Sequence, residues 1–339
     1  MSARARLAAI MGGLAAALLA LMALALFVGS AGVPPAAVIG ALLGRPDSEA
    51  VTRVVVLDLR LPRILAAALA GGALAVAGAG LQALTRNPLA EPSVLGVSSG
   101  AAFGVVAGQL FGLGTGLLEA LGLTAFAFAG AFVAGGVVYL IASAAGGLSV
   151  HTLLLAGVIV GIFFSSAIAV LISLVDTNRL GAIVQWLLGN VSPVPPAALA
   201  VFTLVTLAGV AVVLADARRL NVLALGEDAA RELGVDALAV KRRIFAGAAL
   251  LVSAVVAFAG PIGFVGLIVP HALRMLLGPD NRVLVPAAVL GGAIFLLVAD
   301  TLARNVAAPA ELSVGVLTAF CGAPFFIYLL RARGIRALP

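Results

Sequence analysis

The chain has 339 residues, of which 63% are hydrophobic and only 10% are charged. Because soluble domains carry about 25% charged residues, this composition argues against a soluble fold. One cysteine, Cys321, excludes a disulfide framework, and two histidines are too few for most metal centres, so we expect no metal site. The net charge of +6 comes from basic clusters beside apolar runs. That placement is typical of membrane topology signals and does not indicate a nucleic-acid partner.

Apolar runs long enough to cross a bilayer follow one another along the whole chain, since a membrane-spanning helix needs roughly 20 apolar residues. They predict an all-α, polytopic membrane protein with a single transmembrane domain over residues 1–339. The first run is longer than the apolar core of a signal peptide, so we expect it to be retained. The predicted helices cover residues 7–28, 62–83, 93–111, 121–143, 152–175, 196–215, 242–261, 264–278, 283–303 and 312–330.

Ten spans place both termini on the same side of the membrane. If that side is the cytoplasm, 14 of the 20 Lys and Arg residues lie inside, including Lys241–Arg243 and a basic end formed by Arg331, Arg333 and Arg336. Cytoplasmic loops carry such an excess of Lys and Arg. We therefore expect an inner-membrane-type protein with both termini in the cytoplasm.

No ATP-binding P-loop can be built from this chain. A P-loop needs a lysine followed by Ser or Thr, whereas the only lysine, Lys241, is followed by Arg242. If transport is driven by ATP, a separate ATPase subunit must bind ATP and Mg²⁺, and we expect no cofactor on this chain.

An ion-coupled secondary transporter, acting without an ATPase, is the alternative. Such carriers place ionisable groups near the membrane midplane. On the predicted spans only Asp300 is an acidic residue away from loops and helix ends, and it lies near the outer end of its span. Because Arg304 follows at i+4, we expect a local ion pair there. The shortage of coupling groups argues against a carrier.

A compact charged segment, LNVLALGEDAARELGV (Leu220–Val235), lies in the longest predicted cytoplasmic loop, about 216–241. Its acidic residues, led by Glu227, suit a helix N-terminus. Glu227 and Arg231 have the spacing of an i,i+4 pair, and Gly234 suits the position that ends a helix. The segment therefore predicts a short, capped helix.

This predicted helix has an apolar patch of Ala229, Ala230 and Leu233 beside a charged face. A short helix of that kind, projecting into the cytoplasm, suits docking onto a soluble partner. A solvated loop helix without any partner fits the spacing equally well.

Further stretches are long and specific, namely RNPLAEPSVLGVSSG (86–100), GLIVPHALR (266–274), LVADTLAR (297–304) and ELSVGVLTAFCGAPFFIYLL (311–330). Together with the charged segment they resemble the FecCD-type family, the type II permeases of ABC importers for iron–siderophores, haem and cobalamin. The resemblance covers nearly the whole chain in the same order. The family's ten-helix fold with cytoplasmic termini agrees with the count of apolar runs.

The resemblance implies two copies of the chain around a central pathway, two cytoplasmic ATPase subunits and an external substrate-binding protein. It implies that the charged segment seats in the ATPase. The residues that it assigns to ATPase coupling are Leu225, Gly226, Glu227, Asp228, Ala230, Arg231, Leu233 and Gly234.

Arg60, Arg63 and Arg304 fall at the outer surface in the predicted topology. The resemblance implies that they meet carboxylates of the binding protein, for which guanidinium groups are suited. Snorkelling at the membrane interface or local pairing is the alternative. At the start of the fifth span the resemblance implies a cytoplasmic gate at Val150 and His151. Similar permeases carry small hydroxyl residues there, so the chemistry of the gate is left open.

The expected function is translocation of a metal chelate, with no catalytic residue and no enzymatic activity in this chain. The stretch PHALR (Pro270–Arg274) favours cobalamin or haem, and iron–siderophores come next. We expect the pathway to be lined by apolar and weakly polar side chains such as those of Leu153–Val175.

Overall fold

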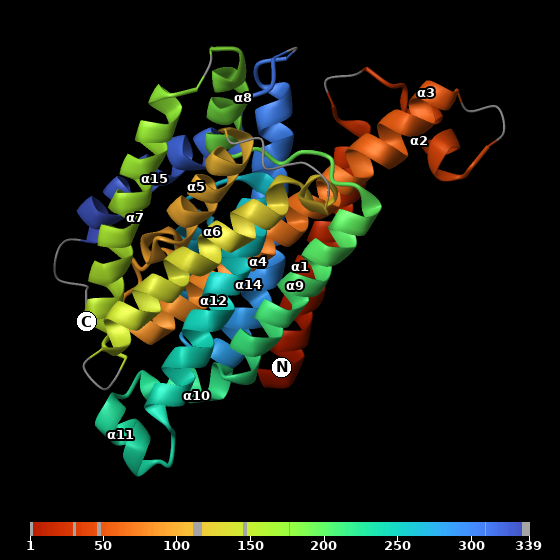
Figure 1. The fold of residues 1–339 in the computed structure, drawn as a ribbon. Helices are drawn as coiled ribbons and strands as arrows, with labels where there is room; N and C mark the ends of the chain where they lie inside the picture. Colours follow the sequence, from red (N-terminus) through yellow and green to blue (C-terminus); the bar gives the residue numbers. More distant parts are fainter. Residues whose placement is uncertain are drawn as a thin grey trace.

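The structure is a computed structural model that describes residues 3–29, 32–45, 49–110, 117–144, 148–175, 177–308 and 310–333. Within these ranges all regular structure is helical. Long helices form one bundle, and short helices project from both of its ends (Figure 1). Arg336, a member of the predicted basic end, lies outside the described residues.

Each predicted span corresponds to a helix of the bundle. Seven helices in the described part are long and apolar enough to cross a membrane, and three shorter apolar helices accompany them. The prediction of a polytopic all-α membrane protein is confirmed. The corresponding helices are α1 (Ala3–Phe27), α4 (Leu61–Thr85), α5 (Val97–Leu110), α6 (Leu117–Ser143), α7 (Val150–Ser173), α9 (Pro196–Ala215), α12 (Ala237–Ala259), α13 (Val265–Leu277), α14 (Asn281–Asn305) and α15 (Val314–Arg333).

The region before α4 differs from the prediction. Helix α3 (Ala50–Arg53) and a π-helical turn (Val54–Arg60) run into α4 without a break, so one continuous span covers Ala50–Thr85. The charged residues of this stretch interrupt the apolar run, which is why the sequence places the helix start later. Two helices in predicted loops were also missed, α2 (Pro35–Leu42) and α8 (Thr177–Leu187).

The predicted loop of about 216–241 is shorter in the structure. Helices α10 (Ala217–Leu223) and α11 (Glu227–Glu232) fill most of it, and α12 begins at Ala237 instead of 242. Asp236 caps α12 by accepting a 3.0 Å hydrogen bond from the backbone N–H of Ala239. An aspartate cap of this kind satisfies a backbone donor that has no partner within the helix.

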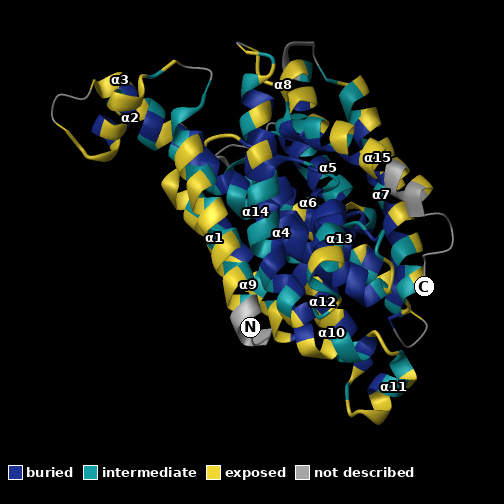
Figure 2. Ribbon diagram, turned by 180° about the vertical axis from the view of Figure 1, so that it is seen from behind, coloured by how far each residue is buried: buried dark blue, intermediate teal, exposed yellow. Residues whose placement is uncertain are grey.

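Helix α4 is the central helix of the bundle, and nearly all of its side chains are buried (Figure 2). Its glycines let neighbouring backbones come very close, as the sequence predicts. A methyl group at Gly71 would overlap the carbonyl oxygen of Gly292 in α14, and one at Gly78 would overlap that of Gly266 in α13. Small residues allow this packing in membranes, where no hydrophobic effect drives helices together.

The bundle has two distinguishable ends. At the α11 end lie α10, α11 and the start of α1, while α2, α3 and α8 lie at the opposite end (Figure 1). Helices α4 and α14 both run the length of the bundle, and they pack side by side. We call the two ends the α11 end and the α3 end.

Candidate functional site

Helices α10 and α11 form the projection at the α11 end. The backbone of Gly226, with φ of 120°, leads into α11, and that of Gly234, with φ of 75°, leaves it. Val235 N–H donates to the carbonyl of Ala230, and Gly234 N–H to that of Arg231, at 2.8 and 2.9 Å. This pair of bonds is a Schellman motif. The prediction that Gly234 ends the helix is confirmed.

The free surface of the projection carries two large apolar side chains among charges. Leu225 and Leu233 are 69% and 63% exposed, respectively. Asp228 and Arg231 are exposed beside them and contact each other at 3.4 Å. Ala230 is fully buried, so its expected place in the surface patch is wrong. The methyl of Ala230 packs inward and holds α11 against the bundle, while the leucines face outward.

The expected ion pair between Glu227 and Arg231 is also wrong. Glu227 Oε1 instead contacts Lys241 Nζ at 2.6 Å, and Arg231 pairs with Asp228. A contact from another helix decides this pairing. Because α12 begins earlier than predicted, Lys241 lies inside this helix and next to α11, where its buried ammonium group needs an opposite charge.

An open cleft of about 490 Å³ separates α11 from the ends of other helices. It lies between the C-terminal end of α4, the N-terminal end of α7, and helices α11 and α12. The cleft therefore brings the two predicted gate residues to the same place as part of the predicted coupling segment. Its lining residues are Leu84, Thr85, Arg86, Leu148, Ser149, Val150, His151, Glu227, Arg231, Leu238 and Lys241.

The two gate residues occupy the first turn of α7. Ser149 caps the helix by accepting a hydrogen bond of 3.3 Å from Thr152 N–H. Val150 is half-buried and His151 is exposed toward the cleft. These side chains thus lie at the N-terminal end of α7, the helix that we expect to line the pathway. Their gating role stays a prediction.

Asp216, at the junction of α9 and α10, fixes the base of the projection. Its carboxylate is buried and accepts hydrogen bonds from the guanidinium groups of two arginines. The donor–acceptor distances are 2.6 Å for Arg219 and 2.5 and 3.0 Å for Arg243. Burial alone would raise the pKa of Asp216, but the hydrogen bonds from Arg243 and Arg219 outweigh it and lower the pKa. From the sequence, these arginines were expected only to set the membrane topology. An aspartate directly after an apolar helix and before two arginines was the available signal.

A second polar junction ties α10 to the start of α14. Asn221 donates to the carboxylate of Asp280 at 2.7 Å and accepts from the backbone and the side chain of Asn281 at 2.9 and 2.8 Å. Asp280 also binds Arg282. This junction was not predicted, although an Asp that precedes an apolar run is a typical helix-capping signal.

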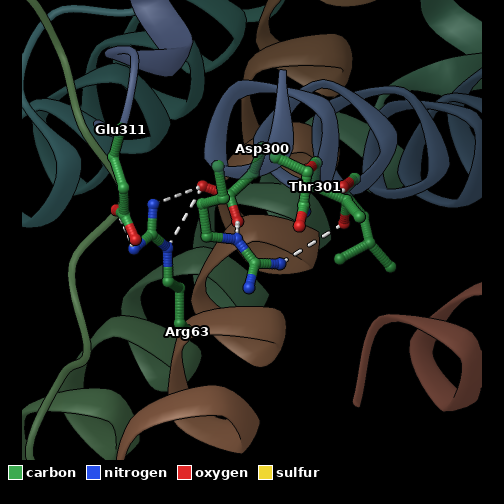
Figure 3. Close-up of polar contacts among 7 residues, drawn as sticks. Arg63, Asp300, Thr301 and Glu311 are labelled. Atoms are coloured by element: carbon green, nitrogen blue, oxygen red, sulfur yellow. Dashed lines mark hydrogen bonds and ion pairs between the residues drawn. The ribbon is translucent and has the colours of Figure 1, made fainter. Parts of the chain in front are cut away.

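At the α3 end, Asp300 lies between two arginines (Figure 3). Arg63 donates to Asp300 from Nε and Nη2 at 3.2 and 3.1 Å, and its Nη1 contacts Glu311 at 2.9 Å. Arg304 Nε lies 3.1 Å from the other oxygen of Asp300. The predicted local pair of Asp300 and Arg304 is confirmed. The contribution of Arg63, from another helix, was not predicted.

The three arginines proposed for docking are buried in this chain. Arg60, Arg63 and Arg304 are 5%, 8% and 4% exposed, and Arg60 donates to the carbonyl of Leu26 at 2.7 Å. In the single chain internal partners occupy these guanidinium groups, as the alternative of local pairing expects. Their role toward a binding protein stays a prediction.

Helix α7 presents a long exposed apolar surface. Leu155, Ile159, Ile162 and Phe163 are all more than half exposed in the single chain. Beside them an open groove of about 470 Å³ carries small and hydroxyl side chains, namely Ser93, Gly157, Gly161, Ser165, Ser166 and Ala169 together with Val94, Val158 and Ile162. This mixed surface has the apolar, weakly polar character that we expect of a pathway.

The described geometry defines a multi-pass helical membrane protein with an anchored, exposed two-helix projection at one end. The chain matches the FecCD transport family over residues 17–332. It belongs to that family, so the resemblance seen in the sequence is confirmed.

Named relatives agree with this assignment. The chain is 44% identical over 287 residues to the cobalamin import system permease protein BtuC of Halobacterium salinarum, which covers 84% of this chain and 76% of the relative. It is 40% identical over 275 residues to the hemin transport system permease protein HmuU of Yersinia pestis, with 81% and 82% covered.

A solved structure described as an inward-facing, metal-chelate type ABC transporter superposes with a TM-score of 0.81 at 33% identity. The match covers 96% of this chain and 99% of the other. The arrangement of the helices is therefore closely similar to that of the solved chain.

Proposed function

We propose that the chain is the permease subunit of an ABC importer in the cytoplasmic membrane. In this proposal two copies enclose one pathway, two ATPase subunits dock at the α11 end in the cytoplasm, and a substrate-binding protein docks at the α3 end outside. Both termini then lie in the cytoplasm. The ATP and Mg²⁺ belong to the ATPase subunits, and this chain binds no cofactor of its own.

The observation that carries the proposal is the exposed surface of α11. Leu225 and Leu233 stand out of the projection, each more than 60% exposed, in a segment whose base is fixed by Asp216. Exposed apolar side chains on a solvent-facing helix suit a protein interface, where a few buried anchors contribute most of the affinity. The charges of Asp228 and Arg231 fit the polar rim of such an interface.

The pathway in this proposal runs along α7 at the contact between two copies. The exposed apolar face of α7 and its hydroxyl-lined groove support that placement. Val150 and His151 form the cytoplasmic gate, because they stand at the α11 end of the same helix. A surface that lacks charges passes a bulky ligand without holding it.

The proposed substrate is a metal chelate, with cobalamin or haem favoured and iron–siderophores next. The relatives named for cobalamin and hemin support this order. Relatives named for Fe(3+)-citrate and iron(3+)-hydroxamate import are 39% and 41% identical, so sequence identity does not separate the siderophores from hemin, whose relative is 40% identical. Uptake assays with cyanocobalamin, hemin and a ferric siderophore in reconstituted vesicles would rank them.

For the binding protein, docking near Arg60, Arg63 and Arg304 requires its carboxylates to compete with the internal partners of these residues. Glu311, whose side chain is 36% exposed, is the accessible member of the network. If a carboxylate of the binding protein replaced Glu311 as the ion-pair partner of Arg63, the charge on Arg63 would stay balanced.

The test begins with native mass spectrometry of the gently extracted complex. We expect two copies of this chain with two ATPase subunits. Leu225→Glu combined with Leu233→Glu should reduce the bound ATPase at least about tenfold. Val306→Glu, at a 68% exposed residue directly after the C-terminal end of α14, is the matched control and should leave ATPase binding unchanged. A particle of this chain alone that transports substrate after reconstitution would overturn the proposal and favour the ion-coupled carrier.

A further inference from the structure

Lys241 is the only lysine of the chain, and its side chain is buried, with 7% exposed. It lies in the second turn of α12 at the floor of the cleft beside α11. A lysine at a membrane end is expected to point its ammonium group into water. The burial of this one therefore calls for a specific set of partners.

The ammonium group has partners on two other segments. Nζ lies 2.6 Å from Oε1 of Glu227 in α11, and it donates a 3.1 Å hydrogen bond to the carbonyl of Leu148. Leu148 is itself buried and directly precedes Ser149, the cap of α7. One side chain thus joins the projection, the beginning of α7 and α12.

This three-way contact cannot survive a relative movement of its members. An ammonium group is costly to bury without an opposite charge. If α11 moves away, Glu227 leaves, and the ammonium group loses the carboxylate that balances it. Lys241 must then turn toward water in the cleft, and its bond to Leu148 breaks as well. The cleft of about 490 Å³ supplies the space for that turn.

The three members differ in how firmly they are held. Helix α12 packs against α4, α6 and α9 in the bundle. It is also fixed at Arg243, two residues after Lys241, by the carboxylate of Asp216. Helix α11 has much less packing, because it contacts chiefly α10 and α12. A force on α11 therefore shifts Glu227 relative to Lys241 more readily than it shifts α12.

We infer that Lys241 is a positioning residue that couples α11 to the start of α7, where the proposed gate residues Val150 and His151 lie. The bridge from Glu227 through Lys241 to Leu148 is made in one nucleotide state of the transporter and broken in the other. This inference rests on the proposed function, in which an ATPase moves α11. It adds the residue through which that movement reaches α7.

The absence of any other lysine gives a direct assay. An amine-reactive acetylating reagent can modify only Lys241 and the chain's N-terminal amine, and peptide mass spectrometry separates the two. The permease–ATPase complex is labelled without nucleotide and after trapping with ATP, Mg²⁺ and vanadate. Arg53→Lys, at an exposed position of the α3 end, supplies a freely reactive standard.

We expect the labelling rate of Lys241 to differ at least about tenfold between the two states, within the range of measured coupling free energies. In one state it should be far below that of the Arg53→Lys standard. In the permease alone, Glu227→Gln should make Lys241 react faster than in the wild type. Equal rates in both nucleotide states, or no effect of Glu227→Gln, would overturn the inference.

Transport supplies a second readout that a purely structural role would not change. Lys241→Met should keep the ATPase bound and active but lower the substrate moved per ATP hydrolysed, and Lys241→Arg should restore part of it. Arg242→Gln removes an adjacent, exposed charge and should leave the ratio unchanged. If Lys241→Met moves as much substrate per ATP hydrolysed as the wild type does, the inference is overturned. Failure of any ATPase to associate would instead overturn the proposed function.

Discussion

The side-chain amide of Asn221 donates a 2.7 Å hydrogen bond to the carboxylate of Asp280, which joins α10 to the start of α14. From there α14 runs the length of the bundle to Asp300, the carboxylate that binds Arg63 and Arg304. One helix thus connects the base of the proposed ATPase-docking projection with the buried ion pairs at the opposite end. The structure provides a physical link between the two proposed docking ends.

Asn221→Ala should loosen this junction. The substitution removes the acceptor for both the backbone and the side chain of Asn281, and Asn281 is only 4% exposed. A buried donor without a partner costs about 1–3 kcal/mol, so we expect a lower thermal midpoint in detergent by circular dichroism. Arg282→Ala is the control, because the Arg282 side chain is 57% exposed and its ion pair with Asp280 is therefore expected to contribute little. A midpoint equal to that of the wild type in Asn221→Ala would contradict the prediction.

Asp300→Asn should destabilise the fold strongly. The carboxylate is fully buried and is the charge partner of both Arg63 and Arg304. Breaking a buried pair while leaving its partner charged costs about 3–5 kcal/mol. We expect poor yield and a large fall of the thermal midpoint. Glu311→Gln, at a residue with a 36% exposed side chain, should have a small effect.

Replacing all three buried charges separates the structural role of the arginines from docking. Arg63→Met, Asp300→Leu and Arg304→Leu combined should recover most of the stability lost in Asp300→Asn, because a well-packed apolar substitute can equal a buried ion pair. If the arginines also dock the binding protein, this folded variant will lose stimulation by that protein. Unchanged stimulation would remove Arg63 and Arg304 from the docking proposal.

The pH dependence of stability should reveal Asp216. Folding lowers the pKa of Asp216 below its ordinary value of 3.8, since the bonds from Arg243 and Arg219 outweigh burial. A carboxylate with a lowered pKa stabilises the fold above its ordinary pKa, and this stabilisation is lost as the pH falls through the lowered value. Asp216→Asn should therefore unfold at a lower temperature than the wild type at pH 7 and at pH 5. The difference should shrink below 3.8.

The matching control for Asp216 is Asp228→Asn. The Asp228 side chain is 96% exposed and makes one weak contact with Arg231. Its substitution should shift the midpoint little at any pH, because exposed pairs contribute little. If the difference in thermal midpoint between the wild type and Asp216→Asn stayed constant down to the most acidic pH, Asp216 would not act through its charge.

The order of the long apolar helices could be predicted from the sequence because lipid imposes a minimum apolar length on every crossing helix. The rule failed where charges lie inside a helix. Arg53, Asp58 and Arg60 interrupt the hydropathy before α4, yet the helix continues through them. Helix α8 (Thr177–Leu187) is too short for a span, so the same rule leaves it in a loop.

The position of α11 in the candidate site could be predicted from the sequence, but the ion-pair partners of its side chains could not. Local signals in the sequence identify α11 and its end at Gly234, because capping depends on neighbouring residues. Partners from other helices cannot be obtained in that way. Arg63 and Asp300 are separated by 237 positions. Glu227 has Arg231 at the right spacing but binds Lys241, since the buried charge gains more from the carboxylate than the exposed one does.

Gly71→Ala should disrupt the contact of α4 with α14. The added methyl group would overlap the backbone carbonyl of Gly292, and a backbone cannot move aside as a flexible side chain can. Forced overpacking of this kind costs about 1–3 kcal/mol or more. We expect a lower thermal midpoint for Gly71→Ala and also for Gly292→Ala. The double variant should be less destabilised than the sum of the two single variants, because both glycines share one contact.

In contrast, a methyl group at Gly136 in α6 meets no atom within 4 Å, so Gly136→Ala should be neutral or slightly stabilising. Equal midpoints for Gly71→Ala and Gly136→Ala would show that the close approach of α4 and α14 does not stabilise the bundle.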